Sequence, residues 1–253
     1  MSYDFALDIP EDFVAPHRVR KVAAFEGNLG GYGRANVPRA LVLHTPEEDA
    51  DDIEVTPRWF QDPRARASTH YYADSDGDLY QMVADADCAW AQGTHAGNRH
   101  WKGGRGALPP WNEGVTNNCR ALSIEIEGRA ATIDETLSEA QRRSVVRWLA
   151  FKSRQYDIPL DRTHVVGHEE LATDKRDPGI ALGTFPIDEL IAEAHAERAR
   201  MEDSEASEQL TLSPVIGRWQ LVKLLVENRV RIEREVPDGA GDARYEVTVK
   251  QAS

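Results

Sequence analysis

One stretch is the most informative part of this sequence: His164-Val-Val-Gly-His168-Glu-Glu-Leu-Ala-Thr-Asp-Lys175-Arg-Asp177-Pro-Gly179. Between His168 and Asp177 it carries an imidazole, an ammonium group and a carboxylate, and the Pro-Gly pair predicts a sharp turn directly afterwards. Imidazole nitrogens and carboxylate oxygens both bind zinc, and a catalytic zinc usually has three protein ligands and one open position for water. Lys175 could direct its charge towards an oxyanion that forms beside such a metal. The stretch therefore predicts two ligands and one charged group of a zinc hydrolase.

The third ligand has to come from another part of the chain, and His44 is the best candidate. It follows the apolar run Ala40-Leu-Val-Leu43, which predicts a short buried strand. A histidine at a strand end is also common in ordinary protein cores, so the assignment depends on the other motifs. Two further histidines are not predicted as ligands. His164 is expected in a supporting or surface position, and His70 either lines a cleft or packs in the core.

The composition is that of a folded protein without a membrane span. Of the 253 residues, 41% are hydrophobic and six are tryptophans, which is enough for a packed core. No run approaches the roughly 18 apolar residues of a membrane-spanning helix, and the first residues lack the segments of a secretory signal. We therefore expect no membrane partner and a protein that is cytoplasmic as made, acting on a cell wall only if released. The net charge of −13 argues against nucleic acid as a partner, because phosphate binding needs clustered Lys and Arg.

The chain contains only two cysteines, Cys88 and Cys119. Two are too few for a disulfide scaffold. One bridge between them is compatible with the sequence, but buried free thiols are the favoured interpretation.

The residue pattern of the sequence changes at about residue 39. Residues 1–38 contain three prolines and a cluster of glycines, and they predict an irregular lead-in. Residues 39–200 form the main domain, in which predicted strands and helices alternate. The predicted elements are strands at 41–43 and 165–166, a hairpin over 68–83 that turns at Asp76-Gly77, a helix from Ser138 to about Tyr156, and a helix from about 185 to Met201.

The end of the chain is predicted as a separate small region. The acidic, serine-containing segment 201–213 is typical of a linker. Residues 214–253 predict a helix near Trp219 and two strands, 229–236 and 245–249. A region of about 40 residues rarely folds stably alone. We therefore expect this α+β appendage to dock on the main body or to mediate self-association.

Two segments leave alternatives open. In the alternating strand 121–128, Glu125 and Glu127 share one face, and water is the favoured environment for that face rather than a site. The loop 91–118 is long for a compact domain. Its residues Trp101 and Trp111 either form a wall for a substrate or pack under their own loop.

Taken together, the motifs resemble the type 2 family of zinc-dependent N-acetylmuramoyl-L-alanine amidases. That family also contains peptidoglycan recognition proteins, phage endolysins and muropeptide-recycling amidases. The resemblance covers roughly residues 39–194 and rests on five motifs in one order. They are a strand ending in His44, Ser68-x-His-Tyr71 with an Asp-Gly hairpin and Tyr80-Gln-x-Val83, Ala89-Trp90, Ser123-Ile-Glu-Ile-Glu-Gly128, and Gly167-His168 followed by Lys175-x-Asp-Pro-Gly179.

The resemblance implies an α/β fold in which helices flank a central mixed β-sheet. It implies zinc as the cofactor, held by His44, His168 and Asp177. Glu125 would be the general base for the attacking water, and Lys175 would stabilise the oxyanion. The implied reaction is hydrolysis of the amide bond between N-acetylmuramic acid and L-alanine in peptidoglycan.

The sequence departs from the family pattern at two places. His95 stands later than the histidine that many relatives carry directly after Ala-Trp, and Thr69 stands where some relatives have tyrosine. Both changes concern substrate contacts or a proton route, so they affect the reaction class less than its details.

Four functions have to be weighed. A lytic, endolysin-like wall hydrolase is the favoured interpretation, and a cytosolic amidase acting on soluble muropeptides is the alternative within the same chemistry. A peptidoglycan-binding module without catalysis would be expected to lack a metal ligand, whereas all three are present. A glycosidase using Glu125 and Glu127 would leave the histidines unexplained.

Overall fold

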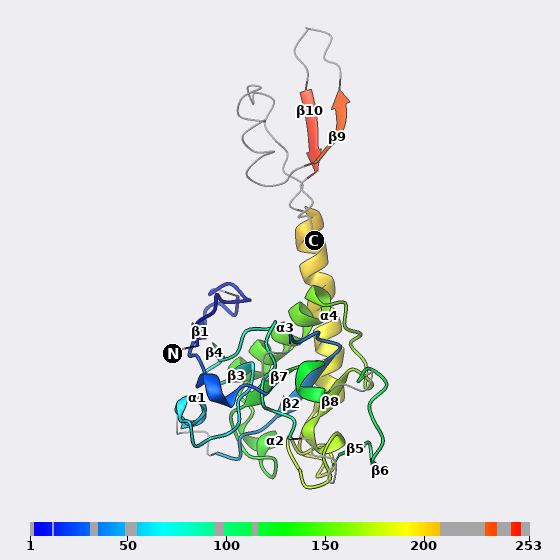
Figure 1. Cartoon of the computed structure of the whole chain (residues 1–253). Coiled ribbons are helices and arrows are strands. Elements are labelled where there is room, and N and C mark those ends of the chain that lie inside the picture. Colours follow the sequence, from blue (N-terminus) through cyan, green and yellow to red (C-terminus); the bar gives the residue numbers. More distant parts are fainter. Residues whose placement is uncertain are drawn as a thin grey trace. The chain divides into compact units, whose positions relative to one another are not determined.

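The computed structural model describes residues 3–11, 13–30, 35–48, 55–93, 99–112, 116–207, 231–236 and 244–248. The chain divides into two compact units, Met1–Arg198 and Ala199–Ser253. The first unit is built on a six-stranded sheet with helices packed against it (Figure 1). The predicted α/β fold with a central mixed sheet flanked by helices is confirmed.

The central sheet has the strand order β1-β4-β3-β7-β2-β8. Only the β3–β4 pair is antiparallel, and the other neighbouring pairs run parallel. Every residue of β2 is buried, as expected for a central parallel strand that is covered on both faces. The strands are β1 (Val19–Lys21), β2 (Ala40–His44), β3 (Tyr71–Ala73), β4 (Leu79–Gln81), β7 (Ala121–Ile126) and β8 (Val165–Gly167).

Helices cover both faces of the sheet. On one face, Trp148 of α3 (Glu139–Gln155) packs against Tyr71 of β3, with ring centroids 5.5 Å apart. On the other face, the next residue of β3, Tyr72, lies in an apolar cluster with Phe60 of α1 (Val55–Gln61). The remaining helices are α2 (Ile133–Thr136) and α4 (Ile187–Ser207), with 3-10 turns η1 (Glu26–Asn28), η2 (Asn117–Cys119) and η3 (His168–Glu170).

Helix α3 shows how local sequence sets one of these elements. Ser138 is its N-cap, and the Ser138 hydroxyl accepts a hydrogen bond from the N–H of Gln141 at 3.0 Å. Val145, Trp148 and Leu149 recur at helical spacing and are fully buried. Helix α4 continues past Met201 to Ser207, into the segment that the composition predicts as a linker.

The segment 1–38 is more regular than its composition predicts. Val19–Lys21 form the edge strand β1, which pairs in parallel with β4. Further upstream, the Tyr3 hydroxyl donates to Asp87 at 2.6 Å. A three-residue strand has no periodicity of its own, so only the neighbouring strand reveals it.

Cys88 and Cys119 form a disulfide bond, with their Cα atoms 4.7 Å apart. The prediction of two free thiols is therefore wrong. Whether two cysteines pair depends on the distance between their Cα atoms, which the fold sets and a sequence separation of 31 residues does not reveal.

The two tryptophans of the 91–118 loop pack under that loop. Trp111 is only 5% exposed, and its indole N–H donates to the main-chain oxygen of Thr163 at 2.9 Å. Trp101, in the small hairpin of β5 (His100–Trp101) and β6 (Gly104–Arg105), meets Trp111 edge-on at 6.5 Å. Trp111 thus belongs to the core and forms no substrate wall.

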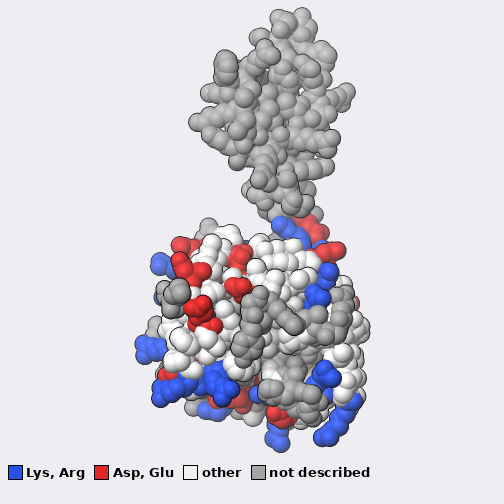
Figure 2. All heavy atoms as spheres, in the orientation of Figure 1, with Lys and Arg blue, Asp and Glu red and all other residues white. Residues whose placement is uncertain are grey.

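The second unit contains an antiparallel hairpin of β9 (Arg231–Val236) and β10 (Arg244–Thr248). The helix expected near Trp219 lies outside the described residues. In the described part of the chain, no helix has the length and apolar character needed to cross a membrane. On the face shown in Figure 2, the described basic side chains lie in separate groups rather than in a continuous stripe.

Candidate metal centre

Two neighbouring strands bring His44 and His168 together. β2 and β8 are parallel, and Leu43 is the register partner of Gly167. The next residue along each strand is a histidine, so both imidazoles lie at the same carboxyl edge of the sheet. Their ring centroids are 4.5 Å apart. Carboxyl edges of parallel strands are where open α/β sheets place their ligands.

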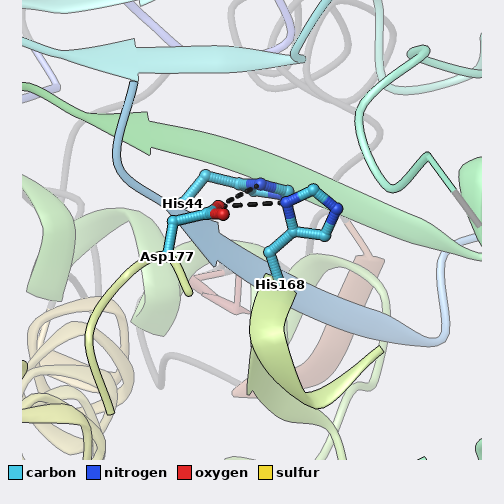
Figure 3. Close-up of side chains that lie close together, drawn as sticks. All are labelled: His44, His168 and Asp177. Carbon is cyan, nitrogen blue, oxygen red and sulfur yellow. Dashed lines mark hydrogen bonds and ion pairs between the residues drawn. The ribbon is translucent and has the colours of Figure 1, made fainter. Parts of the chain in front are cut away.

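Asp177 comes from a loop that returns to the same edge. Its Oδ2 atom lies 3.2 Å from Nδ1 of His44 and 3.0 Å from Nδ1 of His168 (Figure 3). The loop can come this close because residue 167 is glycine. A Cβ on Gly167 would lie 2.7 Å from Cδ of Pro178, closer than such atoms approach. The structure thus gathers the three predicted ligands, with candidate ligand atoms all within 4.8 Å of one another.

The hydrogen bonds around this group show what its atoms can bind. Nε2 of His168 lies 3.0 Å from the main-chain oxygen of Gln92, and only an N–H can face a carbonyl oxygen in this way. Nδ1 of the same ring faces Oδ2 of Asp177 at 3.0 Å. A proton or a metal ion between these two atoms would join them.

Burial and neighbouring groups together set the pKa values of His44 and Asp177. Burial, helped by the neighbouring His168, lowers the pKa of His44 to about 4, so its ring is neutral at pH 7. Burial opposes ionisation of Asp177, but the imidazoles of His168 and His44 outweigh it and hold the pKa of Asp177 below its usual range. The centre therefore joins the ionised carboxylate of Asp177 to the neutral ring of His44, which can offer a lone pair.

These residues fit a metal ion. Two ligand atoms bound at about 2 Å in a tetrahedral site lie about 3.3 Å apart, close to the two O–N distances above. The group is also nearly dry, since His44 is 1% and His168 4% exposed. Two nitrogens and one carboxylate oxygen are the donor set of many catalytic zinc sites.

Glu125 lies beside this group. It is the register partner of His44 in the parallel pair of β7 and β2, so both side chains project to the same face of the sheet. Its Oε2 atom is buried and has no hydrogen-bond partner within the described part of the chain. Burial, and then the charges of Asp177 and Glu48, raise the pKa of Glu125 well above its usual value. Such a carboxylate is well suited to accept a proton.

The carboxylates of β7 therefore do not face water, and the expectation that they do is wrong. Glu125 is partly buried, and Glu127 is fully buried with its Oε2 accepting the N–H of Ser75 at 2.5 Å. Alternation in the sequence shows that the two residues share a face. It does not show that this face is covered by other parts of the fold.

Lys175 lies in the exposed part of the loop between His168 and Asp177. Its charge lowers the pKa of both Glu125 and His44, so the ammonium group is near the centre. Among the described residues it has no ion-pair partner. An exposed cation near the centre can meet negative charge that develops on a substrate.

Sequence reasoning missed Glu48, which lies close to Glu125. The Glu48 carboxylate accepts hydrogen bonds from the hydroxyls of Tyr72 at 2.9 Å and Thr56 at 2.8 Å. It is only 9% exposed, although it stands in an acidic run that is typical of a solvated loop. Its contacts with Tyr72 of β3 and Thr56 of α1 distinguish it from a solvated acidic residue.

Sequence reasoning also missed the contact that holds Nε2 of His168. Gln92, whose carbonyl accepts from that nitrogen, donates its own N–H to the side-chain oxygen of Asn118 at 2.9 Å. Asn118 directly precedes Cys119, and the disulfide to Cys88 joins the two segments that meet here. The disulfide thus lies two hydrogen bonds away from a candidate ligand.

The other histidines lie apart from the centre. His70 is fully buried, and its Nδ1 atom lies 3.0 Å from the hydroxyl of Ser123, so of the two alternatives it packs in the core. His164 pairs with Asp161 at 2.8 Å near the surface. Thr69 is also buried and donates to the Ser123 hydroxyl at 3.1 Å. His95 lies outside the described residues.

Comparison with known proteins gives one family and several distant structures. Residues 34–180 match the family described as N-acetylmuramoyl-L-alanine amidase. No curated protein matches the chain significantly.

Among solved structures, a selenomethionine derivative of AmpD is similar at 20% identity and a TM-score of 0.48, covering 74% of this chain and 99% of that one. The catalytic domain of XlyA is similar at 19% identity and a TM-score of 0.46, over 70% and 99%. The N-acetylmuramoyl-L-alanine amidase LysC from Clostridium intestinale is similar at 16% identity and a TM-score of 0.43, over 70% and 97%.

Proposed function

Because this chain belongs to the N-acetylmuramoyl-L-alanine amidase family, we propose that it hydrolyses the amide bond between N-acetylmuramic acid and L-alanine of peptidoglycan, with zinc as its cofactor. His44, His168 and Asp177 would hold the metal. The observation that carries the proposal is the contact of Asp177 Oδ2 with Nδ1 of both histidines in a nearly dry setting. The ionised carboxylate of Asp177 and the neutral ring of His44 offer an oxygen and a nitrogen ligand to a cation bound there.

The reaction needs a nucleophile and a polarised carbonyl, because an amide carbon is a poor electrophile. When bound, zinc supplies both, since it lowers the pKa of water and acts as a Lewis acid. Glu125 takes the proton of the attacking water and delivers it to the nitrogen of the leaving L-alanine. Its buried, unpaired Oε2 atom is available for that proton. Lys175, exposed and near the centre, stabilises the negative charge on the former carbonyl oxygen.

We further propose a lytic role on intact peptidoglycan. The support is the second compact unit, Ala199–Ser253, which leaves the centre in Met1–Arg198 complete without it. An additional unit suits an enzyme that works on an extended polymer, where two attachment points raise the effective affinity. The tryptophans of the 91–118 loop give no support, because Trp111 packs in the core.

The test combines metal content with the chemistry of cleavage. Purified protein is analysed for zinc, then incubated with purified sacculi with and without a chelator. We expect about one zinc per chain, as for a three-ligand catalytic site, and chelator-sensitive release of new L-alanine amino termini without new reducing sugars.

Each other outcome has a defined meaning. Zinc without release from sacculi, but with cleavage of soluble muropeptides, would replace the lytic role by muropeptide recycling. New reducing sugars would indicate a glycosidase and contradict the amidase. Retention on sacculi without zinc or cleavage would indicate a binding module.

A further inference from the structure

Asp177 must be held against His168 by something other than regular secondary structure. Leu171 and Ala172 are buried directly after η3, but residues 173–176 are all exposed. The chain then turns inward again at Asp177. A metal centre tolerates ligand displacements of only a few tenths of an ångström, so the return of this loop has to be fixed.

Thr184 and Phe185 donate hydrogen bonds to the main-chain oxygen of Gly179, and Glu169 makes the contacts that join the loop to η3. Its main-chain N–H donates to the main-chain oxygen of Asp177 at 2.9 Å. Its carboxylate accepts three main-chain N–H groups just beyond Asp177, those of Gly179 at 3.1 Å, Ile180 at 2.5 Å and Ala181 at 3.0 Å.

Successive main-chain N–H groups that converge on one carboxylate form a strong, charge-assisted arrangement. In this arrangement the backbone of residue 179 has φ +109°, a conformation that favours glycine. Within the described residues, Glu169 has no ion pair with Lys or Arg. These N–H groups are therefore its main electrostatic partners.

The neighbouring Glu170 holds the other side of His168. It accepts the N–H of Gly167 at 3.0 Å and the guanidinium of Arg162 at 2.7 Å, both on the side of β8. Glu170 thus joins η3 to the sheet, whereas Glu169 joins η3 to the loop of Asp177. The two glutamates have different tasks, although they are adjacent in the sequence.

We propose that Glu169 is a positioning residue of the metal centre, which fixes the distance between His168 and Asp177 through the backbone of residues 177–181. The proposal rests on the proposed metal site. Within the described residues, no hydrogen bond or ion pair joins the side chain of Glu169 to the side chains of His44, His168 or Asp177. Its effect therefore has to appear in metal affinity and ligand geometry. Loss of supporting contacts around metal ligands typically weakens binding 10- to 100-fold.

The test compares Glu169→Ala, Glu169→Gln and the control Glu193→Ala. Glu193 is a surface glutamate with several hydrogen bonds to one partner, Arg142, and no contact with the centre. Zinc affinity is measured by competition with a chromogenic chelator. The visible spectrum of the cobalt-substituted protein reports ligand geometry, and amide hydrogen exchange of the metal-free protein reports the loop.

We expect Glu169→Ala to lose zinc affinity by about 10- to 100-fold, to change the cobalt spectrum, and to lose exchange protection at residues 179–181. Glu169→Gln keeps one acceptor oxygen but places an NH₂ group among donors, so its loss should be smaller. Glu193→Ala should match the wild type. Because Glu169→Gln preserves the side-chain shape, it keeps the test decisive if the alanine variant fails to fold.

Two outcomes would overturn the inference alone. One is unchanged protection of residues 179–181 in both Glu169 variants. The other is lost protection with zinc affinity and cobalt spectrum as in the wild type. A wild-type protein that binds no zinc would instead overturn the proposed function, and the inference with it.

Discussion

Two aspartates lie on opposite faces of the central sheet, Asp85 beside a lysine and Asp177 beside two histidines. The polar atoms around Asp85 are all paired, whereas some of those around Asp177 are not. Asp85, on the α3 side, accepts the hydroxyls of Tyr71 at 2.7 Å and Tyr156 at 2.9 Å, and pairs with the ammonium of Lys152. Lys152 is fully buried and also donates to Gln155 at 2.9 Å. Every group in this cluster has a complementary partner.

Asp177, on the other face, lies in a group of side chains whose hydrogen-bonding atoms do not all have partners within the group. Nε2 of His44 and Oε2 of Glu125 are buried without a hydrogen-bond partner in the part of the chain described. Buried polar atoms without partners are costly, so they mark places where a ligand or reactant completes the set. The fully paired cluster of Asp85 stabilises the fold, whereas the group around Asp177, with its unpaired buried atoms, is a candidate site.

The largest effect we expect is on catalysis by Glu125. Glu125→Gln removes the proton acceptor and should lower turnover by about 10²- to 10⁴-fold. The free energy of unfolding should not fall, because Oε2 of Glu125 is buried without a hydrogen-bond partner in the described part of the chain and its ionisation is opposed by burial. Turnover on soluble muropeptides and urea denaturation measure the two effects, with Glu193→Gln as a surface control. Unchanged turnover would remove Glu125 from the mechanism.

The opposite pattern is expected at Lys152. Lys152→Met leaves Asp85 buried without its cation and should lower the free energy of unfolding by about 3–5 kcal/mol. Zinc content per folded chain should stay that of the wild type. Urea denaturation measures the loss, and the double variant with Asp85→Asn should recover part of it, because the two residues interact directly. A stability loss below about 1 kcal/mol, the usual size for an exposed ion pair, would contradict the assigned role of this cluster.

A second lysine sharpens the contrast. Lys175 is exposed, so Lys175→Ala should leave the melting temperature and the zinc content unchanged while turnover falls by about 100-fold. Metal analysis and steady-state kinetics separate the two properties. Should the variant lose its zinc, the role of Lys175 would be support of the metal and not stabilisation of the oxyanion.

The smallest effect is expected from Asn118. Asn118→Ala removes the acceptor of the Gln92 N–H, and the Gln92 carbonyl that orients His168 becomes less constrained. Zinc affinity should fall by about 10-fold, the lower end for such supporting contacts. Asn112→Ala, in the same region but without a bond to Gln92, is the matched control. Equal affinities of the two variants would argue against this route to His168.

The proximity of His44, His168 and Asp177 could be predicted, because the two histidines follow recognisable local patterns. His44 ends an apolar run, and His168 follows another short apolar run. The strand register then brings the two histidines together, because the residues before them, Leu43 and Gly167, are partners across the β2–β8 pair. The central mixed sheet could be predicted for the same reason, as its inner strands are short apolar or alternating runs.

The residues that were missed or misjudged act through contacts between distant segments. The disulfide joins residues 31 apart, and Lys152 reaches Asp85 across 67 positions. Glu48 and Glu169 stand in charged runs that look like solvated surface. For such residues, exposure and partner depend on packing, which no periodicity in the sequence reports.

Strand β1 has a practical consequence for work on this protein. The family match begins at residue 34, so a shortened protein cut to that boundary would lack Val19–Lys21. Strand β4 would then have an unpaired edge, and unpaired edges join to other molecules. Poor solubility of such a fragment would reflect the cut and not the domain, and material for crystallisation should retain the first residues of the chain.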